Sequence, residues 1–297
     1  MQTPVQLNEQ FQSDSITFIH GEGGLSKCII SNQFADAEIY LHGAHVTHFQ
    51  PSNTGAVLWL SEDAIFDSAK AIRGGIPICW PWFGPHPDNS KFPQHGFARV
   101  SQWNVDAVTE TIEGTELILG LYSSEASGKY LNGEFEAKYK VSVGSQLTVE
   151  LGVTNTGSTS LSGIGGALHS YFAISNIDNV LVDGLNNKKF LDQLTGKTMT
   201  QSGHLQFEQE VDSVYFGTSQ PIGLIDELSK RRLQISSEGS ESCVVWNPWT
   251  DKSKLMGDFP DTGFQTMVCI ETANAFSDVR GIEPGETHLL SQTVAIT

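Results

Sequence analysis

The chain has 297 residues, with 34 Asp and Glu against 17 Lys and Arg and a formal net charge of -17. This acidic balance excludes general binding to nucleic acids or anionic membranes, because both require a basic surface. Hydrophobic residues make up 39% of the sequence, including 16 Phe and 6 Trp, which supports a sizeable core and excludes disorder. The length allows one large domain or two ordinary ones.

The N-terminal residues MQTPVQLNEQFQSDS lack the basic and apolar stretches of a secretory signal. No run of about 18 apolar residues indicates a membrane span. Four cysteines lie far apart, without a CxxC pair or zinc-ligand spacing: Cys28, Cys79, Cys243 and Cys269. In a chain of this length they indicate buried thiols of a reducing compartment rather than a disulfide framework. We therefore expect a cytoplasmic protein.

Alternation of apolar and polar residues with a period of two dominates the chain. It is clearest over residues 135–153, where Gly144-Ser145 interrupts it. This pattern predicts a hairpin with one buried face and a two-residue turn. Shorter strands of the same character are predicted over residues 37–49, 116–122, 180–185, 223–237, 242–249 and 287–296.

Sustained helical periodicity is absent from the sequence. The candidate helical segments, residues 61–71 and a turn near 276–280, are short. Strands that follow strands with so little helix between them indicate packed antiparallel sheets. No composition shift, low-complexity linker or internal repeat divides the chain. We therefore predict an all-β fold, a large and mostly antiparallel β-sandwich that forms one domain over residues 1–297.

Residues 71–99, AIRGGIPICWPWFGPHPDNSKFPQHGFAR, are dense in Gly, Pro and aromatic residues. A long, stiffened loop in a compact domain is typical of a functional site. Arg73 and Arg99 lie at its two ends, and a guanidinium matches the oxygens of a phosphate or a carboxylate. Gln94 and His95 add further donors close to Arg99. The alternative for the arginines is a pair of ordinary surface ion pairs.

The aromatic residues of the same loop allow two interpretations. Trp80, Trp82 and Phe83 could form an apolar wall on which a sugar stacks. They could equally pack one end of the sandwich. The sequence leaves both possibilities open.

Three titratable residues stand out, two of them in strand-like segments and the third, Asp212, in a predicted loop. His169 lies in GALHSYFAIS, where a buried histidine is either a satisfied core residue or a catalytic group. Glu271 ends an apolar run in TGFQTMVCIETANA, and burial there can poise a carboxyl as a base. The alternative for Glu271 is a structural hydrogen bond to loop amides. Asp212, in EVDSVYF, is a further candidate as an acceptor for a sugar hydroxyl.

Other chemistry is not indicated. The sequence has no P-loop, GxSxG or HExxH motif. His42, His45 and His48 are spaced three apart, which places neighbours on opposite faces of a strand. This spacing argues against a three-histidine metal site.

Five motifs occur in order along the chain: IRGGIPICWPWFG, PQHGFAR, LHSYFAIS, VVWNPW and CIETAN. Together they resemble the glucose-6-phosphate 1-epimerases of the aldose 1-epimerase (galactose mutarotase-like) superfamily, from about residue 34 to the C-terminus. The resemblance implies a β-sandwich with a sugar site on one concave face and no required metal or organic cofactor. It also implies interconversion of the α and β anomers of glucose 6-phosphate.

The resemblance further implies roles for individual residues. It makes His169 the general acid and Glu271 the general base, each worth roughly 10²–10⁴-fold in rate. An imidazolium and a carboxylate would supply the opposite protonation states that this chemistry uses. The substrate contacts implied at the phosphate and the sugar are Arg73, Gln94, His95, Arg99, Asp212 and Trp82.

We therefore predict an isomerase whose partner is a phosphorylated hexose. A mutarotase for unphosphorylated aldoses and a non-catalytic carbohydrate-binding sandwich are the alternatives. His169 and Glu271 favour the enzyme, because a binding module needs neither, and Arg73 and Arg99 favour the phosphate. No nucleic acid or membrane partner is expected. The preferred hexose and the oligomeric state stay open, with a monomer as the expectation.

Overall fold

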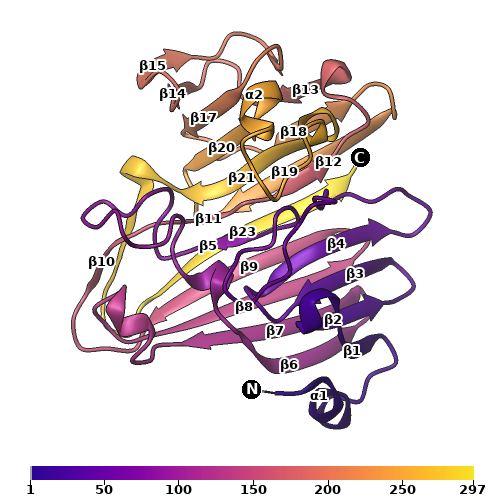
Figure 1. Cartoon of the computed structure of the whole chain (residues 1–297), viewed down its shortest axis with the longest axis vertical. Helices are drawn as coiled ribbons and strands as arrows, with labels where there is room; N and C mark the ends of the chain where they lie inside the picture. Colours follow the sequence, from indigo (N-terminus) through magenta and orange to yellow (C-terminus); the bar gives the residue numbers. More distant parts are fainter. Residues whose placement is uncertain (1) are drawn as a thin grey trace.

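The computed structural model describes residues 2–297 and consists mainly of antiparallel sheet (Figure 1). The predicted all-β fold is therefore confirmed. Two short α-helices interrupt the strands, α1 (Pro4–Gln10) and α2 (Trp249–Ser253). No helix among residues 2–297 is both long and apolar enough to span a bilayer.

Two large sheets dominate the fold (Figure 1). The nine-stranded sheet runs, from edge to edge, through β16 (Leu205–Gln206), β13 (Val180–Asp183), β18 (Ile222–Asp226), β19 (Arg231–Glu238), β23 (Thr287–Ile296), β9 (Leu147–Asn155), β8 (Phe135–Gly144), β7 (Gly114–Tyr122) and β6 (Asn104–Thr111). The eight-stranded sheet runs through β15 (Lys197–Thr200), β14 (Lys189–Asp192), β17 (Val211–Phe216), β20 (Ser242–Asn247), β21 (Met267–Asn274), β11 (Gly166–Leu168) and β5 (Ile78–Cys79), and β12 (Tyr171–Ala173) also pairs with β21.

Two smaller sheets complete the fold. The N-terminal sheet contains β1 (Ile16–His20), β2 (Ser26–Ser31), β3 (Ala35–Tyr40) and β4 (His45–Pro51) in chain order. A two-stranded sheet joins β10 (Leu161–Ile164) to β22 (Arg280–Ile282). Pairings between the strands of all four sheets are antiparallel.

The predicted hairpin over residues 135–153 is confirmed as β8 and β9. Buried and partly exposed residues alternate along both strands, as the sequence pattern requires for one buried face. The predicted two-residue turn is wrong, because Val143 faces Leu147 and three residues lie between them. Gly144 stays within β8 and pairs with Gly114 of β7, so the turn begins later than its glycine suggests.

Of the two segments that the sequence favours as helical, the turn near 276–280 is confirmed as a short 3-10 helix (Phe276–Asp278), and residues 61–71 are not helical. α1 begins at a capping box, in which Thr3 and Gln6 bond reciprocally and Pro4 takes the first position. Residues 61–71 form turns instead of a helix. There the Ser61 and Asp67 side chains accept from nearby backbone N–H groups and compete with helical bonding. Helices of 7 and 5 residues are too short to show a periodic pattern.

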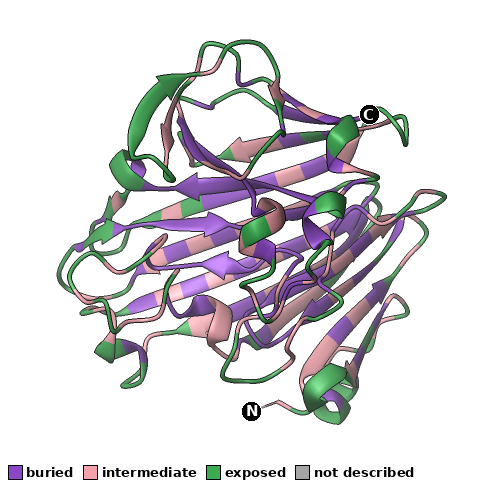
Figure 2. Ribbon diagram, turned by 45° about the horizontal axis from the view of Figure 1, so that its top comes forward, coloured by how far each residue is buried: buried purple, intermediate pink, exposed green. Residues whose placement is uncertain are grey.

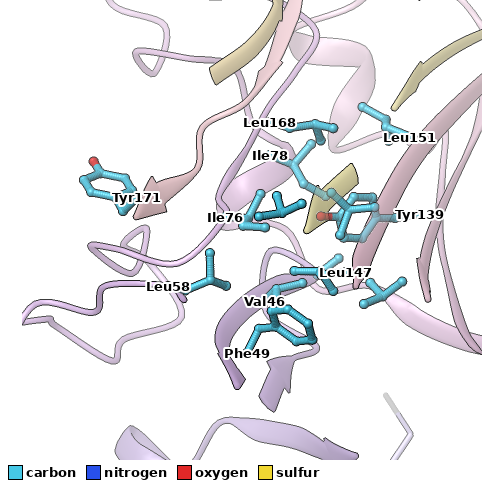
Figure 3. Close-up of a cluster of buried hydrophobic side chains, with 14 of the residues drawn as sticks. Val46, Phe49, Leu58, Ile76, Ile78, Tyr139, Leu147, Leu151, Leu168 and Tyr171 are labelled. Carbon is cyan, nitrogen blue, oxygen red and sulfur yellow. The ribbon is translucent and has the colours of Figure 1, made fainter. Parts of the chain in front are cut away.

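The main core joins the two large sheets to the N-terminal sheet. Figure 3 shows part of it, where side chains of β4, β5, β8, β9 and β11 meet. The labelled members are Val46, Phe49, Leu58, Ile76, Ile78, Tyr139, Leu147, Leu151, Leu168 and Tyr171. Because strands from the first and last parts of the chain share this cluster, the sheets are held in one fixed arrangement.

Strands β20 and β21 are buried along their whole length (Figure 2). One face of this pair is covered by the nine-stranded sheet, where β23 lies against β21. The other face carries a second, smaller apolar cluster: Cys79, Ala167, Val214, Val244, Ala273 and Ala275. Side chains this small leave space beside the sheet for a ligand.

The assignment of Leu147 to the core can be tested against an exposed residue. Leu147 is fully buried, whereas Ile112 is 92% exposed. Leu147→Ala should lower the free energy of unfolding by about 2–5 kcal/mol, because it leaves a cavity. Ile112→Ala should change it by less than about 0.5 kcal/mol. Urea unfolding followed by tryptophan fluorescence measures both, and equal losses would contradict the assignment.

Candidate active site

The centre of the candidate site is a pair of side chains, His169 and Glu271. β11 and β12 pair with β21 in one register, so the two residues between them lie opposite Ile270 and Glu271. His169 is the first of these two residues, and its Nε2 lies 3.3 Å from Glu271 Oε1. Two motifs that are far apart in the sequence are therefore cross-strand neighbours.

Both members of the pair are withdrawn from water, with His169 8% exposed and Glu271 1% exposed. Burial raises the pKa of the Glu271 carboxyl well above its ordinary value. Burial lowers the pKa of the His169 imidazole well below its ordinary value, and the neighbouring groups His95, Arg99 and Arg73 lower it further. Without a ligand the pair is therefore favoured in its neutral form. The imidazolium expected at His169 for the reaction therefore stays a prediction.

The surroundings of the pair leave two polar atoms free. The His169 ring stacks on Tyr171, with centroids 4.8 Å apart, and meets the His95 ring edge-on at 5.9 Å. Nδ1 of His169 and Oε2 of Glu271 are buried and have no hydrogen-bond partner among residues 2–297. Buried polar atoms are seldom left unpaired, so these atoms are available to a ligand.

The pair lies in the wall of a cavity of about 340 Å³, a size typical of small-molecule sites. Seven of the eight site residues predicted from the sequence line this cavity: Arg73, Gln94, His95, Arg99, His169, Asp212 and Glu271. The rest of the wall comes from Phe83, Gly84, Pro85, Tyr171, Gln193, Val244, Trp246, Lys252 and Met256.

The two arginines of the cavity have different partners. Arg73 Nη2 lies 3.1 Å from an Asp258 carboxylate oxygen, and its Nη1 donates to the Tyr171 hydroxyl at 3.1 Å. Arg99 donates to the backbone carbonyl of Gln94 at 2.8 Å and forms no ion pair with the carboxylates of residues 2–297. Arg73 is thus balanced by a carboxylate, and Arg99 is available to an anion.

Gly74 and Gly75 place Arg73 against the sheet. Their φ angles are 105° and 61°, which side chains rarely tolerate. A Cβ atom at Gly75 would lie 2.2 Å from the Val46 carbonyl oxygen. The paired glycines of the RGGIP motif are therefore required by a close backbone approach.

His95 is held in a single tautomer. Its φ of 64° is costly for a residue with a Cβ atom and is supported by two bonds to Gly84. The backbone N–H of His95 donates to the Gly84 carbonyl at 2.7 Å. The backbone N–H of Gly84 donates to the ring nitrogen Nδ1 of His95 at 3.2 Å. Burial lowers the pKa of His95 to about 3. The ring is therefore neutral near pH 7 and carries its proton on Nε2, as a hydrogen-bond donor.

Asp212 on β17 is supported by two side chains that the sequence did not indicate. Its Oδ1 accepts from the Gln193 amide, and its Oδ2 lies 3.8 Å from Lys252 Nζ. Burial raises the pKa of Asp212, and the charge of Lys252 opposes this rise. Lys252 also pairs with Glu210 at 2.9 Å.

The sheet order arranges these groups in a row. β17, β20, β21, β11 and β5 are successive neighbours, about 4.8 Å apart. Asp212 lies on β17, Glu271 on β21 and His169 directly after β11. The loop that follows β5 carries Arg99 at the other side of the pair. The His169–Glu271 pair thus lies between the strand that carries Asp212 and the loop that carries Arg99.

Trp82 is the one predicted site residue that does not line the cavity. Its indole N–H donates to the Pro93 carbonyl at 3.0 Å, and its ring packs edge-on against His86 and stacks beside Phe92. Only 7% of the residue is exposed. The expected sugar contact at Trp82 is therefore replaced by packing within the loop, and Phe83 faces the cavity instead.

Sequence reasoning missed five residues of the site: Tyr171, Gln193, Trp246, Lys252 and Asp258. Tyr171 could have been found, because it lies two residues after His169, where a strand presents side chains on the same face. Trp246 belongs to the VVWNPW motif. Gln193 and Lys252 carry no local signal, since they reach the site only through the packing of β14 and α2 beside β17. Asp258 lies beyond α2 and belongs to the site only through its ion pair with Arg73.

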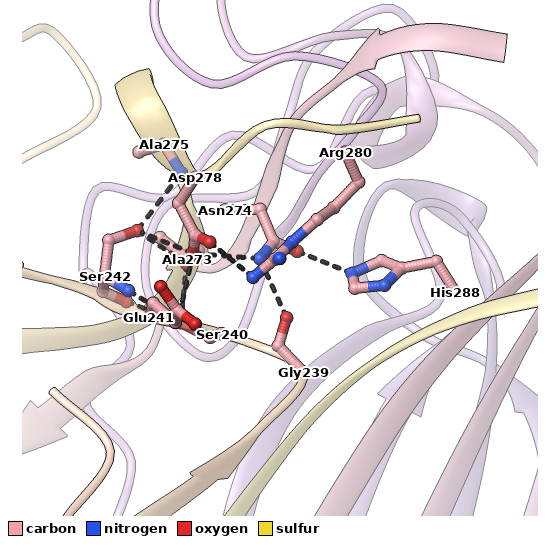
Figure 4. A network of polar contacts seen from close by, with 10 residues as sticks. All are labelled: Gly239, Ser240, Glu241, Ser242, Ala273, Asn274, Ala275, Asp278, Arg280 and His288. Carbon is pink, nitrogen blue, oxygen red and sulfur yellow. Dashed lines mark hydrogen bonds and ion pairs between the residues drawn. The ribbon is translucent and has the colours of Figure 1, made fainter. Parts of the chain in front are cut away.

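A polar network holds the end of β21 beyond Glu271 (Figure 4). The Asn274 amide donates to the Gly239 carbonyl at 2.8 Å and to Asp278 at 3.0 Å. Its carbonyl oxygen accepts from His288 Nε2 at 2.8 Å. These residues do not line the cavity. The asparagine of the CIETAN motif therefore anchors the strand that carries the carboxyl.

The fold and the site together define a class of protein. A β-sandwich that faces a buried carboxyl with an imidazole, inside a polar cavity, is built for proton transfer to and from a small ligand. Within residues 2–297, no group of three or more His, Cys, Asp or Glu side chains could hold a metal ion.

The comparison with known proteins identifies the family. The aldose 1-epimerase family model matches residues 27–295, so the chain belongs to this family of isomerases. A relative from Cenchrus ciliaris named "Putative glucose-6-phosphate 1-epimerase" is 36% identical over 93% of this chain and 86% of its own length. A relative of the same name from Escherichia coli is 32% identical over 92% and 90%. The crystal structure of a putative mutarotase, YeaD, from Salmonella typhimurium superposes with a TM-score of 0.90 at 31% identity, over 97% of this chain and 95% of that one.

Replacing the buried carboxyl should stabilise the protein in a pH-dependent way. Because the folded-state pKa of Glu271 is raised, its stabilising contribution is present at low pH and is lost as the pH rises through that value. Glu271→Gln should therefore raise Tm relative to wild type more at pH 8 than at pH 5. Thermal unfolding at both pH values measures this difference. The exposed Glu208→Gln is the control, and an equal pH dependence in both variants would contradict the burial cost.

Proposed function

We propose that this enzyme interconverts the α and β anomers of a hexose 6-phosphate, with glucose 6-phosphate as the substrate that the names of its relatives suggest. The observation that carries the proposal is the facing His169–Glu271 pair in a cavity shared with Arg99, a guanidinium without a carboxylate partner. Anomer exchange needs one acid and one base at C1 and O5. A phosphate needs a cation.

The order of groups across the sheet matches the order of atoms in the phosphorylated sugar. In a hexose 6-phosphate, the phosphate is carried on C6 beside O5, C1 follows O5, and C2 follows C1. Across the sheet, the loop with Arg99 is followed by His169, Glu271 and Asp212. We therefore assign the phosphate to Arg99, O5 to His169 and the C1 hydroxyl to Glu271. The hydroxyls at C2 and C3 fall to Asp212.

The remaining donors complete this assignment. His95 offers a neutral Nε2–H, and Gln94 lies next to it on the phosphate side of the cavity. Arg73, already paired with Asp258, contributes directed N–H groups with less net charge. We assign these three residues to orientation of the phosphate and the adjacent sugar oxygens, which keeps C1 between acid and base.

In the reaction, one member of the His169–Glu271 pair accepts a proton while the other donates one. Glu271, as a carboxylate, takes the O1 proton while His169, as an imidazolium, protonates O5. The C1–O5 bond breaks and O1 becomes a carbonyl oxygen. Rotation about C1–C2 presents the other carbonyl face, and closure runs the two transfers in reverse. Acid and base each contribute about 10²–10⁴-fold.

The phosphate also prepares the pair for this step. The charges of Arg99 and Arg73 lower the pKa of His169, after burial itself. A bound phosphate dianion offsets these charges and favours protonated imidazole. The proton shared by the pair then moves from the Glu271 carboxyl to His169, which produces the carboxylate and imidazolium of the reactive state. An unphosphorylated sugar lacks this effect.

A mutarotase for unphosphorylated aldoses is the second candidate. The Arg73–Asp258 ion pair favours it, because it removes one of the two arginine charges from a phosphate. Arg99 favours the phosphorylated substrate instead.

We further propose that the chain forms one domain and acts in the cytoplasm. A contiguous buried cluster extends from Leu7 to Val294, and all four cysteines are unpaired thiols.

Anomer exchange measured by NMR tests the activity. The enzyme should accelerate exchange of glucose 6-phosphate far more than exchange of glucose. His169→Ala and Glu271→Gln should each reduce kcat by at least about 100-fold, because each removes one proton-transfer group. If neither sugar exchanges faster with wild type, the proposed function is wrong. A fully active variant at either position would exclude that residue from the chemistry.

Binding of the phosphate by Arg99 can be distinguished from a general effect of losing one positive charge. Arg99→Ala should raise KM for glucose 6-phosphate about 10–100-fold, the loss expected for a charge-assisted hydrogen bond. KM for glucose should change by less than about twofold. Arg232→Ala is the matched control, because it removes the same charge from a site paired with Asp183 outside the cavity. A similar rise for both sugars would contradict the assignment.

A further inference from the structure

The gap between β11 and β12 leaves the ladder to β21 incomplete. In an antiparallel ladder, a hydrogen-bonded pair of residues exchanges two N–H···O bonds. Ser170 and Ile270 lie opposite each other in this ladder. The Ile270 N–H donates to the Ser170 carbonyl at 3.2 Å, which is one of the two expected bonds. The Ser170 N–H turns back to the Leu168 carbonyl at 2.9 Å, so the Ile270 carbonyl does not receive the reciprocal bond.

Gln292 occupies this position from the opposite sheet. It lies on β23 and is fully buried. Its Nε2 donates to the Ile270 carbonyl at 3.3 Å and to Thr272 Oγ1 at 3.0 Å. Its Oε1 accepts from the Ser170 hydroxyl. One amide thus bridges both sides of the gap and replaces the missing ladder bond.

This polar cluster sits where the two large sheets otherwise meet through apolar side chains. Gln292 and Ser170 are 0% exposed and Thr272 is 3% exposed. Buried polar groups cost free energy unless every bond is made, and an apolar residue would pack there at lower cost. Ser170 follows His169, while Ile270 and Thr272 flank Glu271. The cluster therefore bonds to residues adjacent in sequence to both His169 and Glu271.

We propose that Gln292 is a positioning residue, whose amide holds open the gap between β11 and β12 and sets the separation of His169 and Glu271. This inference rests on the proposed function and deepens it. Without the amide, the Ser170 N–H can satisfy the Ile270 carbonyl only by leaving Leu168. That change closes the gap into a regular ladder, rotates the backbone at His169 and redirects its imidazole.

Gln292→Met tests the proposal with a side chain of similar shape and no amide. We expect kcat for glucose 6-phosphate exchange to fall about 10–100-fold, the cost of displacing a reacting group by about 1 Å. KM should change by less than about twofold, because the residues assigned to the phosphate do not contact Gln292. A loss confined to kcat is what a merely stabilising residue does not produce.

Asn155→Leu is the matched control. Asn155 is also fully buried, and its amide donates to the Thr159 and Ile282 carbonyls at 2.8 Å each, outside the cavity wall. Both variants should lower Tm by several degrees, since each leaves buried carbonyls unpaired. Only Gln292→Met should lower kcat. Equal kcat in the two variants at comparable loss of Tm overturns the proposal.

Two further measurements keep the outcome decisive. If Gln292→Met does not fold, Ser170→Ala removes one bond of the cluster and should lower kcat several-fold, and an unchanged kcat overturns the proposal. The imidazole NMR resonances of His169 should shift in Gln292→Met and stay in place in Asn155→Leu. If wild type shows no anomer exchange, the proposed function is wrong. The His169 resonances then decide the inference alone, and unchanged resonances overturn it.

Discussion

A carboxyl and an imidazole buried side by side form the interaction on which the rest of the site depends. Removal from water favours the neutral form of each group, so the pKa of Glu271 is raised and that of His169 is lowered. Charges near the pair shift the balance between its neutral and its charged form. The cation of Arg99 on one side and the carboxylate of Asp212 on the other supply such charges, and the proposed substrate brings a further one.

The residues proposed to transfer protons and the residues proposed to bind the phosphate lie on different parts of the fold. Glu271 lies on β21, which is buried along its length, anchored beyond the carboxyl by the Asn274 network and contacted from behind by Gln292. Reacting groups on rigid strands are held more closely than groups on loops. Arg99 and His95, which we assign to the phosphate, come instead from the long loop after β5. Loops tolerate change, so this division allows substrate preference to vary while the acid/base pair is retained.

Much of the site could be predicted from local patterns. Glu271 could be found because a carboxyl that ends an apolar run is conspicuous, and Arg99 because cations are few in an acidic chain. Trp82 was expected to contact the sugar but packs within the loop, because composition alone does not tell which aromatic side chains of a loop face a cavity. Asp258 and Lys252 could not be found, because their neighbours in the sequence are ordinary and their contacts with Arg73 and Asp212 are long-range.

The sequence by itself determined the all-β class, the buried face of the hairpin over residues 135–153 and the side chains able to transfer a proton or bind an anion. These properties depend on residue type and on a period of two along the chain, both of which are local. Only the tertiary structure decided that His169 faces Glu271, that Asp258 neutralises Arg73 and that Gln292 completes the ladder. Strand register and sheet packing create those contacts, and both arise from burial summed over the whole core rather than from any short segment.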